Sequence, residues 1–225
     1  MILAIETSGK TASVCLFDKE ARSVKAEMTV HTEKTHSQII LPMCESLMKT
    51  ADIDFEDIEN IAVSKGPGSY TGLRIGIAAA KAMALGLGIK TYGISSLLAL
   101  AMEALSQEGR RVCALIHARQ DLWYAGCYFI KDGRLSTVFE EQILSGEELK
   151  EKYDKGCFEV IAGLDYPQWV RDETGPEIAR VSVRAENLCR AAAYSKETEA
   201  EELNASYLQV TEAERNIGIN GGKKS

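Results

Sequence analysis

The order of strands and helices that the sequence predicts repeats in the two halves of the chain, and this repetition limits the possible folds more than any other feature. In each half the apolar spacing predicts three strands, followed by helix, strand and helix. The strands expected in the first half span residues 1–5, 11–17, 23–30, 61–63 and 90–94, and its helices span 36–49, 72–87 and 95–106. In the second half we expect strands at 112–116, 123–130, 135–141 and 158–162 and helices at 146–153 and 185–194. Such a repeat predicts a duplicated α/β domain.

A polar segment from Gln107 to Arg110 separates the two halves. The chain is long enough for two domains of about a hundred residues each. We therefore expect an N-terminal domain at residues 1–106 and a C-terminal domain at 107–215, each a mixed sheet with flanking helices. Residues 216–225 contain Gly218, Gly221, Gly222 and two lysines, which is typical of a flexible tail.

The composition is that of a soluble globular protein, with 45% hydrophobic and 26% charged residues. The longest apolar run, residues 75–100, is interrupted by Lys81 and Lys90 and does not suit a membrane span. No basic region precedes an apolar run at the N-terminus, so no signal peptide is expected. The six cysteines form no CxxC pair and are interpreted as reduced thiols. These features predict a cytoplasmic protein without a membrane partner.

The net charge of −7 argues against a protein that grips nucleic acid by itself, because phosphate binding usually needs a basic stripe. If RNA is involved, another protein is expected to hold most of it. Neither a catalytic triad nor a histidine pair with metal-binding spacing is present, so catalytic and metal sites are predicted to be absent. The segment from Ala4 to Thr11 lacks the first glycine of a phosphate-binding loop and precedes a strand, which favours a hairpin turn.

The segment from Gly66 to Arg74 joins a predicted strand to the predicted helix at 72–87. A glycine loop before a helix can present backbone N–H groups to an anion, and Arg74 could add a positive charge. Alternatively, the glycines only permit a tight turn, while Ser69 or Thr71 caps the helix. The sequence leaves both interpretations open. The candidate anion- or nucleotide-binding residues are Glu6, Gly66, Gly68, Ser69, Thr71 and Arg74.

Small residues recur every fourth position along the helix at 72–87, from Gly72 to Gly88. They share one face and allow another helix or sheet to approach closely. This partner could be the protein's own sheet or first helix, or another subunit; we favour another subunit, because the first helix has a wide apolar surface. The predicted interface residues are Ile39, Ile40, Met43, Leu47, Gly72, Gly76, Ala80, Met83 and Ala84.

Four segments together resemble the TsaB family: residues 2–8, residues 36–38 running to Pro42, residues 66–76 and residues 93–97. The resemblance is close over about residues 1–105 and looser beyond. It implies two actin-like domains of the ASKHA, RNase H-like class. It also implies a scaffold role beside TsaD and TsaE in threonylcarbamoyl transfer to the adenosine next to the tRNA anticodon. In this family the first two helices contact TsaD. When a family member is alone, the same helices contact a second copy of that family member.

The resemblance further implies that tRNA is reached through the complex, that the chain has no cofactor of its own, and that the complex binds ATP or ADP. TsaD-like proteins carry two metal-binding histidines where this chain has Ser96 and Leu100, so transferase chemistry is not expected here. Residues 117–119 read His-Ala-Arg where the family usually has Asp-Ala-Arg. Residues 207–209 read Tyr-Leu-Gln where the family usually has Tyr-Leu-Arg.

The alternative function is an actin-like nucleotide hydrolase or kinase-like enzyme that uses Glu6 and the loop at residues 66–72. Phosphoryl transfer needs carboxylates that hold the metal–nucleotide. Glu6 is one candidate, and the sequence offers no convincing second.

Overall fold

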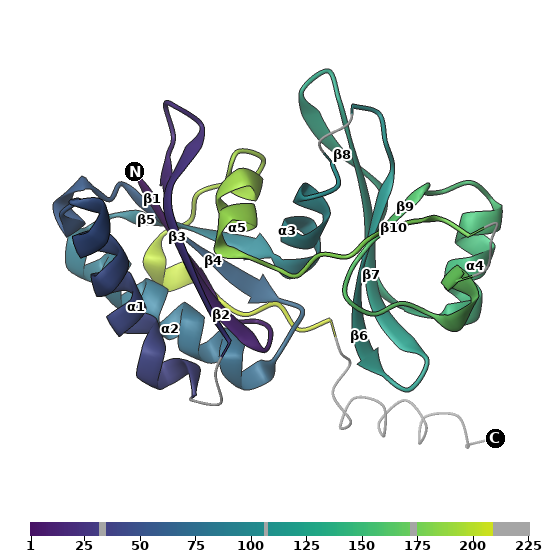
Figure 1. The fold of residues 1–225 in the computed structure, drawn as a ribbon, viewed down its shortest axis with the longest axis horizontal. Coiled ribbons are helices and arrows are strands. Elements are labelled where there is room, and N and C mark those ends of the chain that lie inside the picture. The colour runs from purple at the N-terminus through teal and green to yellow at the C-terminus, as the bar shows by residue number, and fades with distance from the viewer. Residues whose placement is uncertain (32–34, 106–107, 172–174, 209–225) are drawn as a thin grey trace, which may run out of the picture.

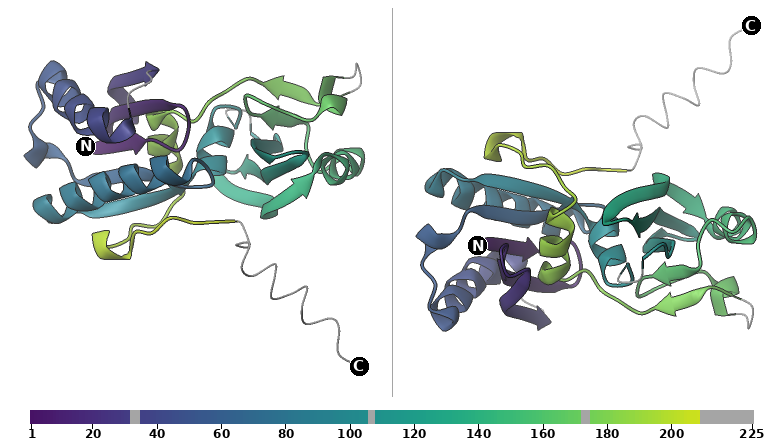
Figure 2. Two further views of the ribbon diagram at one scale, coloured as in Figure 1. Left: turned by 90° about the horizontal axis from the view of Figure 1, so that it is seen from below. Right: turned by 90° about the horizontal axis from the view of Figure 1, so that it is seen from above.

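A computed structural model describes residues 1–31, 35–105, 108–171 and 175–208. The predicted tail at 216–225 lies outside these residues. Within them the chain forms two five-stranded sheets, with helices on the outer side of each sheet and two further helices between the sheets (Figures 1 and 2). None of the helices in the described ranges is long and apolar enough to cross a membrane.

The first sheet has the strand order β3-β2-β1-β4-β5. Its strands are β1 (Ile2–Glu6), β2 (Thr11–Asp18), β3 (Ser23–His31), β4 (Asn60–Gly66) and β5 (Lys90–Ser95). The first three strands are antiparallel, whereas β4 and β5 continue the sheet in parallel with β1. Helices α1 (His36–Ala51) and α2 (Tyr70–Leu87) cover the outer face, with the short helix η1 (Phe55–Asp57) after α1.

The second sheet has the order β8-β7-β6-β9-β10, which is the order of the first sheet repeated. Its strands are β6 (Val112–Arg119), β7 (Leu122–Lys131), β8 (Arg134–Ser145), β9 (Val160–Ala162) and β10 (Glu177–Ala179). Helix α4 (Gly146–Asp154) and the short helix η2 (Gln168–Arg171) pack on its outer side. The predicted duplication of a mixed α/β sheet is thereby confirmed.

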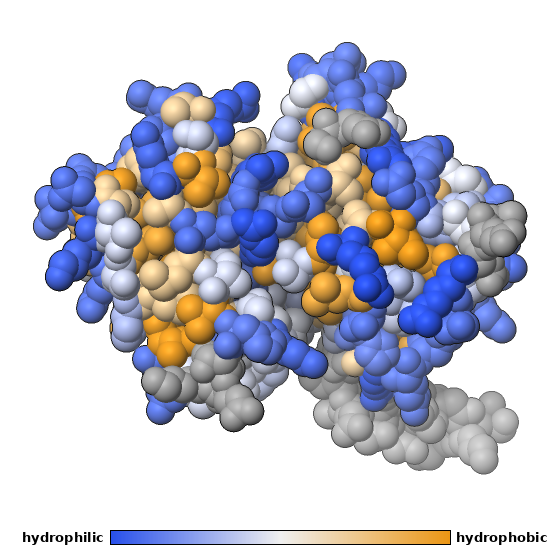
Figure 3. Space-filling model, in the orientation of Figure 1, coloured by the Kyte–Doolittle hydropathy of each residue, from blue (hydrophilic) through white to orange (hydrophobic). Residues whose placement is uncertain are grey.

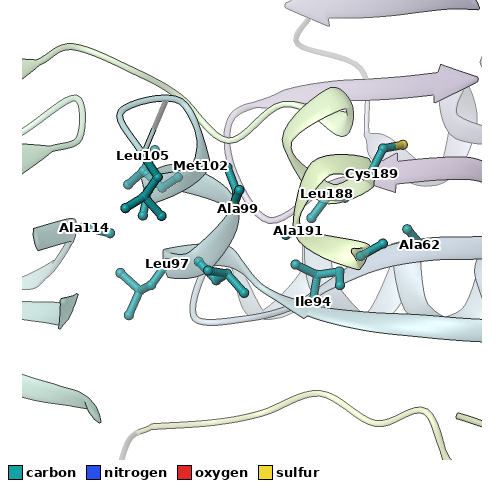
Figure 4. Close-up of a cluster of buried hydrophobic side chains, with 14 of the residues drawn as sticks. Ala62, Ile94, Leu97, Ala99, Met102, Leu105, Ala114, Leu188, Cys189 and Ala191 are labelled. Atoms are coloured by element: carbon teal, nitrogen blue, oxygen red, sulfur yellow. The ribbon is translucent and has the colours of Figure 1, made fainter. Parts of the chain in front are cut away.

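The two inner helices cross between the halves. Helix α3 (Ser96–Met102) follows the first sheet in sequence but packs on β6 and β7, and α5 (Ala185–Ala192) follows the second sheet but packs on β1 and β2. Figure 4 shows the buried side chains where α3 and α5 meet. A 3-10 turn, η3 (Ala200–Glu202), belongs to a C-terminal segment that returns to the first sheet, where Thr198 pairs with Thr91. The predicted division at residues 106 and 107 thus separates the strands of the two sheets, but not their helices.

Most predicted elements lie within two residues of the observed ones, and the differences have local causes. Helix α2 begins at Tyr70 because the Ser69 hydroxyl caps it, accepting a hydrogen bond from the Gly72 N–H. Strand β10 was not predicted, because three residues carry too little periodicity to be detected. Helix α3 ends at Met102 and is shorter than the predicted 95–106.

Candidate functional site

The glycine loop after β4 packs directly on the turn that follows β1. The Ser69 N–H donates a hydrogen bond to the Ser8 carbonyl at 2.8 Å. A Cβ atom at Gly68 would lie 2.7 Å from the same carbonyl oxygen, and one at Gly72 would lie 2.0 Å from the Thr7 carbonyl oxygen. These distances are shorter than van der Waals contact, so glycine is required for the close approach of the two segments.

The C-terminal segment crosses the other side of this loop. The Ser206 N–H donates to the Lys65 carbonyl at 2.7 Å. Gly66 has φ +110°, and a Cβ there would lie 2.7 Å from the Ser206 carbonyl oxygen. The loop is therefore held between two parts of its own chain.

Glu6 is buried at the end of β1, with 1% of its surface exposed. Its carboxylate accepts hydrogen bonds from the Ser8 N–H, at 2.5 Å, and from the Ser64 hydroxyl. Burial raises the pKa of Glu6, and these hydrogen bonds offset the rise in part. The side chain connects β1, β4 and the following turn, which is a structural role.

The Arg74 side chain contacts a pair of tyrosines, Tyr70 and Tyr207. Its guanidinium lies 4.1 Å from the centre of the Tyr70 ring, and the Tyr70 and Tyr207 rings are 5.4 Å apart. A hydrogen bond with Tyr207 raises the pKa of Arg74. Ser8 contacts both Glu6 and Ser69, which links the end of β1 to the glycine loop, whereas Thr71 and Arg74 are exposed at the start of α2. Tyr207 was missed because its contact joins residues far apart in sequence.

The small-residue face of α2 is directed inward. A Cβ at Gly76 would lie 2.3 Å from the Thr7 hydroxyl, while Ala80 and Ala84 are fully buried in the core shared with α1 and the first sheet. Packing within the monomer, the alternative to a subunit interface, therefore accounts for this face.

This burial corrects the predicted interface set. Ile39 and Met83 are half-buried and can still contact a partner. The other predicted residues are covered by their own chain: Ile40, Met43, Leu47, Gly72, Gly76, Ala80 and Ala84. The error arose because an apolar or small-residue row shows that a face is packed, not whether its neighbour belongs to the same chain.

A different apolar surface on the same helices remains accessible. Leu41 on α1 and Leu85 on α2 are 46% and 55% exposed. Between the helices lies a shallow, mostly apolar groove of about 300 Å³, whose lining includes Leu41, Phe55, Met83 and Leu87. Figure 3 shows hydrophobic residues at this end of the molecule. Leu41 and Leu85 could have been found as apolar residues outside the buried rows of their helices.

The two positions that correspond to the metal-binding histidines of TsaD-like proteins, Ser96 and Leu100, are packed into the core. Ser96 is fully buried and Leu100 is 2% exposed. No group of three or more metal-binding side chains occurs in the part of the chain that the structure describes. At the end of β6, the His117 ring lies 4.9 Å from the Trp123 ring, and its Nε2 atom is 2.8 Å from the Gln120 carbonyl oxygen. Gln209 lies outside the described residues.

Comparison with known sequences gives consistent relatives. A family model described as TsaD, tRNA N6-adenosine threonylcarbamoyltransferase, matches residues 27–171. The chain is 33% identical to the tRNA threonylcarbamoyladenosine biosynthesis protein TsaB of Bacillus subtilis, over 95% of this chain and 96% of that protein. It is 32% identical to TsaB of Escherichia coli, over 75% of this chain and 73% of that protein. A threonylcarbamoyltransferase of Pelobacter propionicus is 32% identical over only 42% of this chain and 32% of that protein.

Solved structures give the same result. YeaZ from Pseudomonas aeruginosa superposes with a TM-score of 0.77 at 29% identity, covering 92% of this chain and 99% of that chain. A protein described as similar to peptidase YeaZ, also from Pseudomonas aeruginosa, superposes with a TM-score of 0.79 at the same identity and coverage. The similarity thus extends through both sheets and confirms the expected two-domain, actin-like fold.

Proposed function

Because the chain belongs to the TsaB family of tRNA threonylcarbamoyladenosine biosynthesis proteins, we propose that it serves this modification as a non-catalytic, partner-binding subunit. Its expected partners are TsaD and TsaE, with a second copy of the chain on the same surface when it is alone. It would reach tRNA through the complex in the cytoplasm, and ATP or ADP binding would belong to the complex.

The observation that carries this proposal is the accessible apolar surface of α1 and α2. Both helices are anchored to the first sheet by their buried rows, so the groove between them is held by a packed core. Leu41 lines this groove and is 46% exposed, and large exposed apolar side chains at a groove are typical of helix-binding surfaces. A partner helix that buries them would gain about 25 cal/mol for each Å² of apolar surface.

The buried state of Ser96 and Leu100 supports a non-catalytic role. TsaD-like proteins bind their metal from these two positions, whereas here one side chain is a hydroxyl in the core and the other is a hydrocarbon. Neither can supply the imidazole nitrogens that a catalytic metal would need.

The nucleotide-enzyme alternative receives less support from the geometry. Glu6 is engaged by Ser8 and Ser64, and backbone atoms of Ser8 and Ser206 lie against the glycine loop. Calorimetric titration with magnesium-ATP tests the alternative directly, and tight stoichiometric binding by the isolated chain would revive it.

The scaffold proposal is tested by co-purification with TsaD from the same organism. Leu41→Glu places a charge in the groove between α1 and α2 and is expected to weaken TsaD binding tenfold or more, since a charge buried without a partner is costly. Leu164→Glu is the matched control, because Leu164 is 61% exposed on the second half of the molecule. This control should bind TsaD as the wild type does.

Thermal unfolding is measured beside binding, and neither substitution should lower the melting temperature much, because both sites are exposed. Equal binding by the two variants would show that the groove between α1 and α2 is not the contact surface. Transfer of threonylcarbamoyl to tRNA by the purified chain alone would contradict the non-catalytic role.

A further inference from the structure

A second accessible site lies at the opposite end of β1 from the glycine loop. A pocket of about 640 Å³ is bounded by the β2–β3 turn, α5 and the end of α3. Ile2, at the start of β1, lines this pocket, whereas Thr7 and Ser8, just beyond the end of the same strand, contact the glycine loop. In Figure 1, α5 lies between the β2–β3 hairpin and α3. The pocket is therefore separate from both the glycine loop and the α1–α2 groove, and its volume lies in the range of about 300–1,000 Å³ usual for small-molecule sites.

The floor of this pocket is apolar and held in place by the core. Ile2, Met102 and Leu105 each line it and are 7% exposed or less. They come from β1, from the end of α3 and from the segment that follows α3, and they belong to the central core that joins the two halves. Phe17 and Tyr92 add aromatic surface to the lining. A floor of this kind favours a hydrocarbon or aromatic body over a fully polar ligand.

The rim of the pocket is cationic, although the chain as a whole has a net charge of −7. Lys19, Arg22 and Arg190 line it, against a single lining carboxylate, Glu186. Lys19 is bound to Asn60 and lies 3.5 Å from Glu59, and Arg190 is bound to Glu186. Among the described residues Arg22 forms no ion pair, so its charge remains available to a ligand.

The turn that carries Arg22 is fixed before any ligand arrives. The Asp18 carboxylate accepts hydrogen bonds from the N–H groups of Glu20 and Ala21 at 3.0 and 2.9 Å. Arg22 itself has φ 51°, which closes the hairpin toward β3. A preformed turn reduces the ordering cost of binding.

We propose that this pocket binds a small amphipathic anion, whose apolar or aromatic body lies on the Ile2, Met102 and Leu105 floor and whose acidic head group pairs with Arg22. The acidic head is a carboxylate, phosphate or sulfonate, because these groups match the geometry of a guanidinium. The apolar floor gives affinity and the cationic rim selects the charged ligand.

Two fluorescent probes of similar shape test the proposal on the full-length chain. 8-Anilinonaphthalene-1-sulfonate carries an anionic head, and N-phenyl-1-naphthylamine presents nearly the same aromatic body without it. The wild type should bind both probes saturably, and the sulfonate more tightly. Arg22→Glu should weaken sulfonate binding about tenfold or more and leave the neutral probe nearly unchanged, because only the charge at the rim has changed.

Arg134→Glu is the matched control, since Arg134 is also an exposed arginine at a hairpin, but on β8 of the second sheet. It should bind both probes as the wild type does. Ala193→Trp, at an exposed position of the pocket wall, should weaken both probes together by filling the space. The proposal is overturned if neither probe binds saturably, if Arg22→Glu and Arg134→Glu bind the sulfonate equally, or if Ala193→Trp leaves both affinities unchanged.

Discussion

The two sheets of this protein have the same strand order but differ in the segment that comes after their central parallel strand. In the first sheet β4 leads into a glycine loop and the long helix α2, whereas in the second sheet β9 leads into residues 163–167 and the short helix η2. In the first half, Gly68, Gly72 and Gly76 let the loop and helix lie against Thr7 and Ser8. No comparable glycine series follows β9 in the sequence.

The side chains at the corresponding strand ends differ as well. Ala4 pairs with Ala62 in the first sheet, as Ala114 pairs with Ala162 in the second. Ala4 and Ala114 are therefore equivalent positions on β1 and β6. Two residues further along each strand, Glu6 in the first half corresponds to Ile116 in the second. The first half thus buries a carboxylate next to its glycine loop, where the second half has an apolar side chain. One topology can be specified by a tightly fitted polar turn or by ordinary hydrophobic packing.

The largest expected effect concerns the independence of the halves. A fragment of residues 1–106 retains all five strands of the first sheet but lacks α5, which covers the inner face of that sheet. We expect this fragment not to fold cooperatively, because burial of that face provides much of its driving force. Circular dichroism and NMR dispersion measure this. A dispersed spectrum with cooperative unfolding would show that the first half is self-sufficient.

Within the full chain, Gly72→Val should be strongly destabilising. The added Cβ would lie 2.0 Å from the Thr7 carbonyl oxygen, and this contact involves backbone that cannot move freely. We expect a loss of about 3 kcal/mol in the free energy of unfolding, measured by urea titration. Gly86→Ala in the same helix is the control, because no atom lies within 4 Å of its added Cβ, and it should be neutral or slightly stabilising. Similar losses in both variants would refute the close-packing explanation.

The same variant tests whether the crossed helices make the two sheets one folding unit. Both tryptophans, Trp123 and Trp169, belong to the second half, so their fluorescence reports on that half. In Gly72→Val we expect the fluorescence transition to shift as far as the circular dichroism transition, since α3 and α5 pack on each other between the sheets. An unshifted fluorescence transition would show that the halves unfold separately.

Glu6 should give the first half a pH dependence that Ile116 cannot give the second. Because burial raises the pKa of Glu6 above its ordinary value near 4.5, the folded chain retains a proton that the unfolded chain has released. The stability from this group is therefore full below about that ordinary value and falls as pH rises through the raised pKa. Glu6→Gln does not titrate and should show a smaller fall in the free energy of unfolding between pH 5 and pH 8. Parallel pH profiles for the two proteins would contradict the assignment.

The smallest expected losses of stability come from removing the helix caps, of which each half has one at the start of an outer helix. The Ser69 hydroxyl accepts a hydrogen bond from the Gly72 N–H, and the Ser145 hydroxyl accepts one from the Glu148 N–H, each at 3.2 Å. Replacing either serine by alanine should cost about 1 kcal/mol of stability. Urea unfolding measures both changes. A much larger loss for Ser69→Ala would show that the glycine loop, and not the cap alone, depends on that side chain.

Local patterns allowed much of the fold to be predicted from the sequence. The strand at 11–17 and the helix at 36–49 were placed nearly as observed, because apolar spacing depends on neighbouring residues. The glycine loop was recognised as important, but the sequence left anion binding and a tight turn with a helix cap open. The contacts that this loop makes with Thr7, Ser8 and Ser206 could not be predicted, because those residues lie 58 or more residues away from Gly66 in the chain.

The sequence by itself determined the repeated order of elements, the glycine spacing after β4 and the family to which the chain belongs. Only the tertiary structure decided that α3 and α5 exchange sheets, that the small face of α2 is directed inward, and that Leu41 and Leu85 remain exposed. The same holds for the pocket at the β2–β3 turn, whose walls come from widely separated parts of the chain. The physical reason is that periodicity records which side chains are buried, whereas the identity of the covering surface is set by long-range packing.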